Sequence, residues 1–511
     1  TKVSRFFVKT LFRLLFRKPN GTERGFRFLG LGLMKRTHLT LTAALCVLLA
    51  GCASNTEFLQ EQAKLEPAEW TATLPELQPP TLLGDKTWWQ AWNNPELTAL
   101  LQAAAQHNTD ILTALANLRS AAALADGATA ALFPTFTANG QGSGNRAQNN
   151  WSEGWQAGAS GAWAISLAGG NIAAKRAADL EAMASAMTLE DTRIAVAAEV
   201  AQTYVSLRLA YVQKLIAEMT LSNYKQAADI ARWNYEAGMS DKTEVDQAVS
   251  NEENARAQIP LLEQSIDSYR NALARLTGQS VATLDVKPAE TVPAAPMALA
   301  VSLPAQTLKQ RPDMRAATYS LQAASDRVYE ARSQWFPTLN LSGNIGTKAA
   351  TITTLGASGT GVAGILAALA FPLLDWGAQV TATEQQLAAL DQARANYTKT
   401  LLAALEQTEN AITGITTSQS RADALQRALT AAESAADLAM QQYSAGLTDY
   451  QTVLNTQRTL YSVRENEQSN KADLATQLIA LYRAMGGGWK PTTENGAAET
   501  EPQTTDNGTA G

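Results

Sequence analysis

Histidine and cysteine, which supply many protein nucleophiles, proton shuttles and zinc ligands, are almost absent from this chain. Its 511 residues include two cysteines, Cys46 and Cys52, and two histidines, His38 and His107. Three of these four lie in one N-terminal stretch, so His107 is the only imidazole in the rest of the chain. This distribution excludes most histidine-based triads, zinc sites with several His or Cys ligands, and disulfide frameworks.

Carboxylates are plentiful, but they form no evident catalytic pattern. Asp375 is the one that stands on an apolar background, and we interpret it as a cap for the helix that follows. His107, in "AAAQHNTDIL", is interpreted as a polar surface residue. We therefore predict no catalytic residue, no metal and no cofactor. The net charge of −6 argues against a nucleic-acid partner, because such binding requires a basic face.

Cys52 is the residue for which the sequence does predict chemistry. It ends the stretch "LAGC", which follows a short basic segment and an apolar run too short to span a membrane. This resembles the bacterial lipobox, in which the cysteine is lipidated and begins the mature protein; the alternative is an ordinary secretory signal. Ala53, in place of Asp, favours sorting to the outer membrane. Residues 1–33 are interpreted as lying upstream of the true start rather than as an amphipathic membrane helix.

The next signal is a turn that the chain contains twice. "YEAGMSD" at 235–241 returns as "YSAGLTD" at 443–449, with helical sequence on both sides of each copy. Gly238 and Gly446 suit the left-handed position that follows a helix end. Each copy then offers caps for a returning helix: Ser240 and Asp241 in the first, Thr448 and Asp449 in the second.

Long helices must position these turns. No proline or glycine occurs between Asn171 and Ala237, and 378–445 repeats this feature with one interruption, Gly414. Both stretches space apolar residues as a coiled-coil seam does: Val196, Val200, Thr203, Leu207 and Ala210 in the first, and Leu401, Leu405, Thr408, Ile412 and Ile415 in the second. We expect returning helices near 242–276 and 449–485, and helices before the strands at about 98–132 and 312–335.

Two strand-like pairs, opened by "FPTF" and "FPTL", precede the long helices. In "PTLNLSGNIG" and "WQAGASGAWAISL" apolar and polar residues alternate, which predicts a sheet with one apolar face. Apolar and polar residues alternate in this way both in membrane β-barrels and in soluble antiparallel sheets, so the pattern does not distinguish the two. Four strands are too few to close a membrane barrel, so the membrane reading requires self-association. Three copies would supply twelve strands and twelve helical rods.

Several motifs occur in a characteristic order: "WWQAWNNPEL", "NTDI", two "FPT" segments, "LKQRPDMRAA", "FPLLDWG", the two turns and "GGGW". With the lipobox and the duplication, they resemble the TolC-family outer-membrane factors, in the lipoprotein branch of tripartite RND-type efflux pumps. One departure is at Ala164 and Ser166, where many relatives carry acidic residues. The resemblance implies a mainly α-helical fold, in which a trimer forms a 12-stranded β-barrel continuous with a 12-rod helical barrel.

The resemblance also implies a function without catalysis. The homotrimer would be a passive exit duct, lipid-anchored in the outer membrane of a Gram-negative bacterium and extending into the periplasm, gated at its periplasmic tip. Its partners would be a periplasmic adaptor and an inner-membrane RND-type transporter. The alternatives are the adaptor itself, which carries one helical hairpin rather than two, and a lipoprotein enzyme.

Site residues follow from the same resemblance. The turns that would contact the adaptor are Gly238, Met239, Ser240 and Asp241, and Gly446, Leu447, Thr448 and Asp449. Thr452 and Asn455 would face the pore and form the gate, where many relatives place aspartates. Glu244 and Tyr443 would tie neighbouring helices together as a latch. The alternative is that these are solvated cap residues.

We expect residues 1–51 to be an upstream segment and a removed signal peptide, and 52–97 to be a lipid-anchored and equatorial segment. The first repeat is expected at 98–278, with strands at about 134–168 and its tip at 238–241, and the second at 312–486, with strands at about 337–374 and its tip at 446–449. Residues 279–311 would be an equatorial linker between the repeats, and 487–511 a disordered tail.

Overall fold

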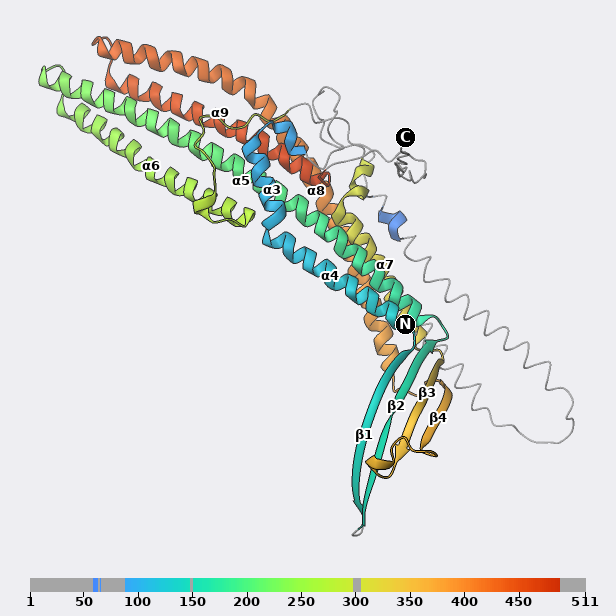
Figure 1. Cartoon of the computed structure of the whole chain (residues 1–511). Helices are drawn as coiled ribbons and strands as arrows, with labels where there is room; N and C mark the ends of the chain where they lie inside the picture. The colour runs from blue at the N-terminus through green and yellow to red at the C-terminus, as the bar shows by residue number, and fades with distance from the viewer. Residues whose placement is uncertain (1–57, 63–64, 66–87, 148–149, 297–304, 488–511) are drawn as a thin grey trace, which may run out of the picture. The chain divides into compact units, whose positions relative to one another are not determined.

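The computed structural model describes residues 58–62, 65, 88–147, 150–296 and 305–487 (Figure 1). The predicted signal peptide, Cys52 and the tail beyond residue 487 lie outside the described residues. Nearly all of the described residues belong to one compact unit, which begins at Glu61.

The main elements are α3 (Pro95–His107), α4 (Thr109–Ala130), β1 (Thr135–Ala147), β2 (Asn150–Ser166), α5 (Gly170–Glu236), α6 (Lys242–Thr277), α7 (Pro312–Ser333), β3 (Thr338–Ala349), β4 (Gly361–Ala370), α8 (Ala378–Ser444) and α9 (Tyr450–Ala484). Helix, strand pair, long helix and returning helix therefore occur twice in the same order. The predicted fold class, mainly α-helical with a small antiparallel sheet, is confirmed. Short 3-10 segments, among them Trp88–Trp92 and Ala305–Gln310, precede the two repeats.

The long helices α5 and α8 contain 67 residues each, so each is about 100 Å long at 1.5 Å per residue. Gly414 does not interrupt α8. A Cβ atom at this position would lie 2.6 Å from the Gln477 side chain of α9, so glycine permits the two helices to approach closely. Most predicted seam residues are buried, among them Val200 and Leu207 in α5 and Ile412 in α8.

One predicted helix is wrong in its continuity. The stretch expected as a single helix at 98–132 is divided into α3 and α4 at Asn108, whose backbone is extended. The Asn108 side-chain oxygen accepts hydrogen bonds from the backbone amides of Asp110 and Ile111, and these bonds cap the start of α4. The Nδ2 atom of Asn108 donates to the Leu276 carbonyl at 2.8 Å. A capping asparagine thus bends the chain and ties the bend to the end of α6.

Helix α5 is the element around which the others are arranged. It contacts α6, α9 and α3 over one part of its length and α4 and α7 over another. Helices α8 and α9 form the second antiparallel pair, and α7 also contacts α8. In Figure 1 the two turns lie at the same end of the long helices, and the sheet lies at the other end. None of the described helices combines the length and apolar content needed to cross a membrane.

The four strands form one antiparallel sheet in the order β1-β2-β3-β4, so β1 and β4 are its edges. The register places Trp163 opposite Leu341 and Ile165 opposite Leu339, on one apolar face. On the other face β1, β2 and β3 are mainly polar, with Gln156 opposite Gln141, whereas β4 adds the apolar Val362 and Leu366. The predicted alternation is confirmed. Strand β4 ends at Ala370 rather than near 374, because Pro372 has no amide hydrogen to continue the ladder.

The junction between sheet and helix uses one of the residues that depart from the family pattern. The Ser166 hydroxyl accepts a hydrogen bond from the Gly170 amide at 3.0 Å, and Asn171 Nδ2 donates to the Ala164 carbonyl at 2.9 Å. Asp375 has the corresponding role before α8, where it accepts from the amides of Gly377 and Gln379. The Asp375 carboxylate therefore caps the first turn of α8, as predicted. The N-cap position itself is occupied by Gly377.

Candidate functional site

The two glycine turns have the same backbone geometry. Gly238 and Gly446 both have φ +73°, in the left-handed region that glycine adopts without strain. In the first turn the Met239 amide donates to the Asn234 carbonyl, and in the second the Leu447 amide donates to the Gln442 carbonyl, at 2.8 and 2.9 Å. These bonds satisfy carbonyls that the helix end would leave unpaired. The predicted left-handed glycines are confirmed.

An aspartate starts each returning helix. Asp241 accepts from the Glu244 amide at 3.1 Å, and Asp449 accepts from the Thr452 amide at 2.9 Å and from the Thr452 hydroxyl at 2.6 Å. The hydroxyl and amide of Thr452 hold the pKa of Asp449 below its usual value. Asp241 and Asp449, rather than Ser240 and Thr448, are therefore the N-caps.

Apolar side chains project from both turns into solvent. Met239 is 73% exposed and Leu447 is 78% exposed, while Ser240 and Thr448 are half-buried. Trp233, one helical turn before the first glycine turn, is 65% exposed and lines a hollow of about 520 Å³ together with Ser444 of α8. Exposed Met, Leu and Trp side chains are typical of surfaces that bind other proteins.

The structure brings Glu244 and Tyr443 together. The Tyr443 hydroxyl donates to Glu244 Oε1 at 2.6 Å, which joins the end of α8 to the start of α6. Tyr443 is 3% exposed, and burial, followed by the Glu244 carboxylate, raises the pKa of the tyrosine above its usual value. The phenol therefore remains a neutral hydrogen-bond donor throughout the physiological pH range.

Further polar contacts between the two halves lie nearby, and the sequence analysis did not identify them. Asn251 Nδ2 donates to the Tyr450 hydroxyl at 3.3 Å, and Arg458 donates to Asn251 Oδ1 at 3.2 Å. Asn223 donates to the Tyr461 hydroxyl at 2.7 Å. These tyrosines belong to a hydrophobic core of alanine, tyrosine and aliphatic side chains, in which α5, α6, α8 and α9 pack together beside the turns. No sequence motif marks these asparagines, and the equivalent positions of the second half, Ala431 and Thr459, are not asparagine.

Thr452 and Asn455 lie together on the exposed face of α9. Asn455 Oδ1 accepts from Gln451 Nε2 at 3.2 Å. Five exposed, uncharged polar residues form a row along α9 at alternating spacings of three and four: Thr452, Asn455, Thr459, Ser462 and Asn466. The exposed charged residues Arg458 and Glu465 lie to one side of this row. A helix that lines an aqueous space with this row would present hydroxyl and amide groups rather than carboxylates.

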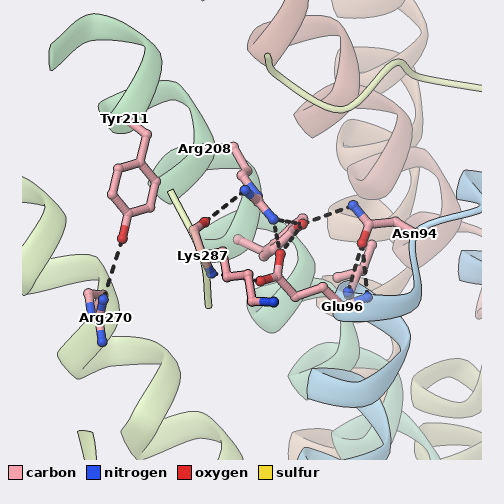
Figure 2. Close-up of polar contacts among 8 residues, drawn as sticks. Asn94, Glu96, Arg208, Tyr211, Arg270 and Lys287 are labelled. Carbon is pink, nitrogen blue, oxygen red and sulfur yellow. Dashed lines mark hydrogen bonds and ion pairs between the residues drawn. The ribbon is translucent and has the colours of Figure 1, made fainter. Parts of the chain in front are cut away.

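A second polar cluster, which includes Asn94 and Glu96 of the motif "WWQAWNNPEL", holds this motif against α5 (Figure 2). Arg208 forms an ion pair with Glu96, donates to the Tyr204 hydroxyl at 2.6 Å and donates to the Lys287 carbonyl at 3.0 Å. The Glu96 carboxylate also accepts from the Lys287 amide at 2.9 Å, and Asn94 donates to Tyr204. These contacts join α3, α5 and the segment after α6, so we assign the cluster a structural role.

Within the described part of the chain, no group of three His, Cys, Asp or Glu side chains could hold a metal ion. His107 is the last residue of α3, and it is exposed. The arrangement at the turns offers two exposed apolar ends, one hydrogen bond from a buried phenol to a carboxylate, and one row of uncharged polar residues on α9. Exposed apolar ends of this kind suit the docking of another protein.

Comparisons with known proteins give consistent matches. The sequence pattern of a family described as outer membrane efflux protein matches residues 100–279 and 303–487. The pyoverdine export outer membrane protein OpmQ of Pseudomonas aeruginosa is 29% identical over 472 residues, which cover 89% of this chain and 98% of that protein. The toluene efflux pump outer membrane protein TtgC of Pseudomonas putida is 25% identical over 468 residues, covering 89% and 96%.

Among solved structures, the outer-membrane channel OprN superposes with a TM-score of 0.77 and 27% identity, covering 83% of this chain and 98% of OprN. The match therefore includes nearly the whole of that channel. The residues matched by the family pattern likewise include both repeats, with the sheet and both turns.

Proposed function

This chain belongs to the outer membrane efflux protein family, and from that premise we propose that three copies form the outer-membrane exit duct of a tripartite efflux pump. The duct is a passive conduit that extends into the periplasm. The observation that carries the proposal is the four-stranded sheet with two free edges, placed at one end of two long helical hairpins.

The sheet supports a trimeric barrel. Its apolar face carries Trp163, Ile165 and Leu341. On the other face β1, β2 and β3 carry mainly Ser, Thr, Asn and Gln, which is the distribution expected when lipid lies outside and water inside. Free edges cannot face lipid, because their amides and carbonyls would lack partners. Pairing β4 of one copy with β1 of the next removes every edge and gives twelve strands in three copies.

The turns suit docking of a periplasmic adaptor that connects the duct to an inner-membrane RND-type transporter. Met239 and Leu447 are exposed at the tips, and Trp233 lies beside them. Apolar anchors of this kind contribute much of the binding energy at protein interfaces. OpmQ is named for pyoverdine export and TtgC for toluene efflux, so the family framework does not assign one cargo to this chain.

Gating takes place on the exposed face of α9. Three-fold symmetry turns Thr452 and Asn455 into two uncharged polar rings, and the Tyr443–Glu244 hydrogen bond holds α8 and α6 in the latched arrangement. An uncharged ring selects cations less than a ring of carboxylates would. Lipidation of Cys52 adds a second membrane anchor beside the barrel.

The test is purification of the full-length membrane form, followed by native mass spectrometry, negative-stain imaging and planar-bilayer recording. The expected result is a trimer, a hollow tube whose helical part is about 100 Å long, and ion conductance. Cross-linking that ends at dimers or continues to tetramers would contradict the twelve-strand barrel. A solid particle without conductance would favour the adaptor, which has no reason to form a pore.

A further inference from the structure

The polar face of the sheet is almost free of charge. Across the described strands and the β3–β4 loop, the charged side chains are Arg146, Glu153 and Lys348. Lys348 lies opposite Gln156, which in turn lies opposite Gln141, so its side chain is on the polar face. Arg146 and Glu153 lie on the other face. Lys348 is therefore the single charged residue of the polar face in the described part of the sheet.

The carboxylate nearest along the strands is held away from Lys348. Glu153 accepts hydrogen bonds from the indole nitrogens of Trp151 and Trp155, at 3.2 and 3.4 Å, on the apolar face. Lys348 itself is exposed, and its backbone amide donates to the Thr360 carbonyl at the end of β3 that is remote from the helices. No carboxylate on its own face of the described strands neutralises its ammonium group.

Three-fold assembly would bring three such ammonium groups into one ring. Twelve strands spaced about 4.8 Å apart and tilted by about 40° give a barrel with a radius of roughly 12 Å. An extended lysine side chain reaches about 6 Å inward, which leaves each charge about 6 Å from the axis. This separation is shorter than the Debye length of about 10 Å at 0.1 M salt, so the three potentials overlap at the centre.

On the basis of the proposed trimeric duct, we propose that Lys348 is a specificity-determining residue that makes the outer end of the duct selective for anions. Three charges at about 6 Å in water, screened at 0.1 M salt, raise the anion concentration at the axis roughly sevenfold. With uncharged rings at the proposed gate, this ring is the main fixed charge on the polar face of the barrel. The cargo class that it favours is anionic solutes and amphiphiles.

The experiment is the reversal potential of trimers in planar bilayers under a KCl gradient, near 0.1 M and again near 1 M salt. At the lower salt, Lys348→Gln should reduce the chloride-to-potassium permeability ratio severalfold, Lys348→Glu should reduce it further, and Lys348→Arg should keep it. At about 1 M the Debye length falls to about 3 Å, so the differences should disappear.

Arg146→Gln is the matched control. It removes one positive charge from the same end of the sheet but from the apolar face, so the permeability ratio should stay that of the parent. Equal ratios for parent and Lys348→Gln, or an equal change in Arg146→Gln, would overturn the inference while the duct itself stands. Trimers that fail to conduct in every variant would instead refute the proposed function.

Discussion

Replacing Tyr443 with phenylalanine tests the latch with the smallest change in packing. The ring is 3% exposed and lies 5.9 Å from the Tyr450 ring, and phenylalanine fills the same space. The substitution removes the hydroxyl that donates to Glu244 at 2.6 Å and leaves a half-buried carboxylate without this donor. The packing energy should therefore change little, and the effect should come from the lost hydrogen bond.

The size of the effect follows from the type of bond. A hydrogen bond to a charged acceptor contributes about 1.5–3 kcal/mol, and the lower end applies here because Glu244 is only half-buried. Three latches that open together would shift the equilibrium by about 4.5 kcal/mol, which is roughly a thousandfold. Because the pKa of Tyr443 is raised, this contribution is complete below the ordinary tyrosine pKa of about 10 and is lost only as the pH rises through the raised value.

The assay is single-channel conductance of the trimer at neutral pH, with Tyr450→Phe as the control. Tyr450 is also 3% exposed, but its hydroxyl accepts a longer bond, 3.3 Å, from a neutral amide, so its loss should change the open probability far less. We expect frequent open events in Tyr443→Phe and parental behaviour in Tyr450→Phe. Unchanged conductance in Tyr443→Phe, or an equal increase in both variants, would remove the Tyr443–Glu244 bond from the gate.

Three further outcomes are expected. Asn455→Asp should increase cation selectivity and make the closed state sensitive to divalent cations in planar bilayers, because three carboxylates would meet in a narrow pore; behaviour identical to the parent would exclude Asn455 from the gate. Cys52→Ser should abolish the acyl mass on the N-terminal peptide and reduce the yield of trimer more than the conductance per trimer; an unlipidated parent peptide would contradict this. Gly446→Ala should destabilise the trimer by about 1 kcal/mol per chain in thermal unfolding, because φ is +73° although space for a methyl group is open; an unchanged midpoint would show that the turn relaxes at no cost.

The regular parts of the fold could be predicted because each depends on local sequence. The absence of Pro and Gly predicted α5 to within one residue at each end, and "YEAGMSD" and "YSAGLTD" located both left-handed glycines. Pro312 begins α7 at the predicted position. The prediction of these features depends only on backbone preferences and on a repeating pattern of apolar residues.

Contacts between distant segments were harder to foresee. Asparagine at position 108 is a local signal for the start of a helix, because it is a preferred N-cap residue, and the sequence reading missed it. The hydrogen bond from its side-chain amide to the Leu276 carbonyl, far along the chain, has no local signal. The bond between Tyr443 and Glu244 came from family resemblance rather than from spacing, and Asn251 and Arg458 were missed altogether. Such polar pairs depend on the alignment of two hairpins, which single-sequence patterns do not encode.

The equal lengths of α5 and α8 limit how this chain can evolve. Each has 67 residues, and the bond between Tyr443 and Glu244 requires both turns to end at the same level. Loss of one heptad from α5 alone would retract its turn by about 10 Å and misalign the pair. We therefore expect an insertion or deletion in one long helix to be tolerated only when the other long helix changes length by the same amount. Substitutions that keep both lengths are free of this constraint. The duplicated halves can thus diverge in sequence while their lengths remain coupled.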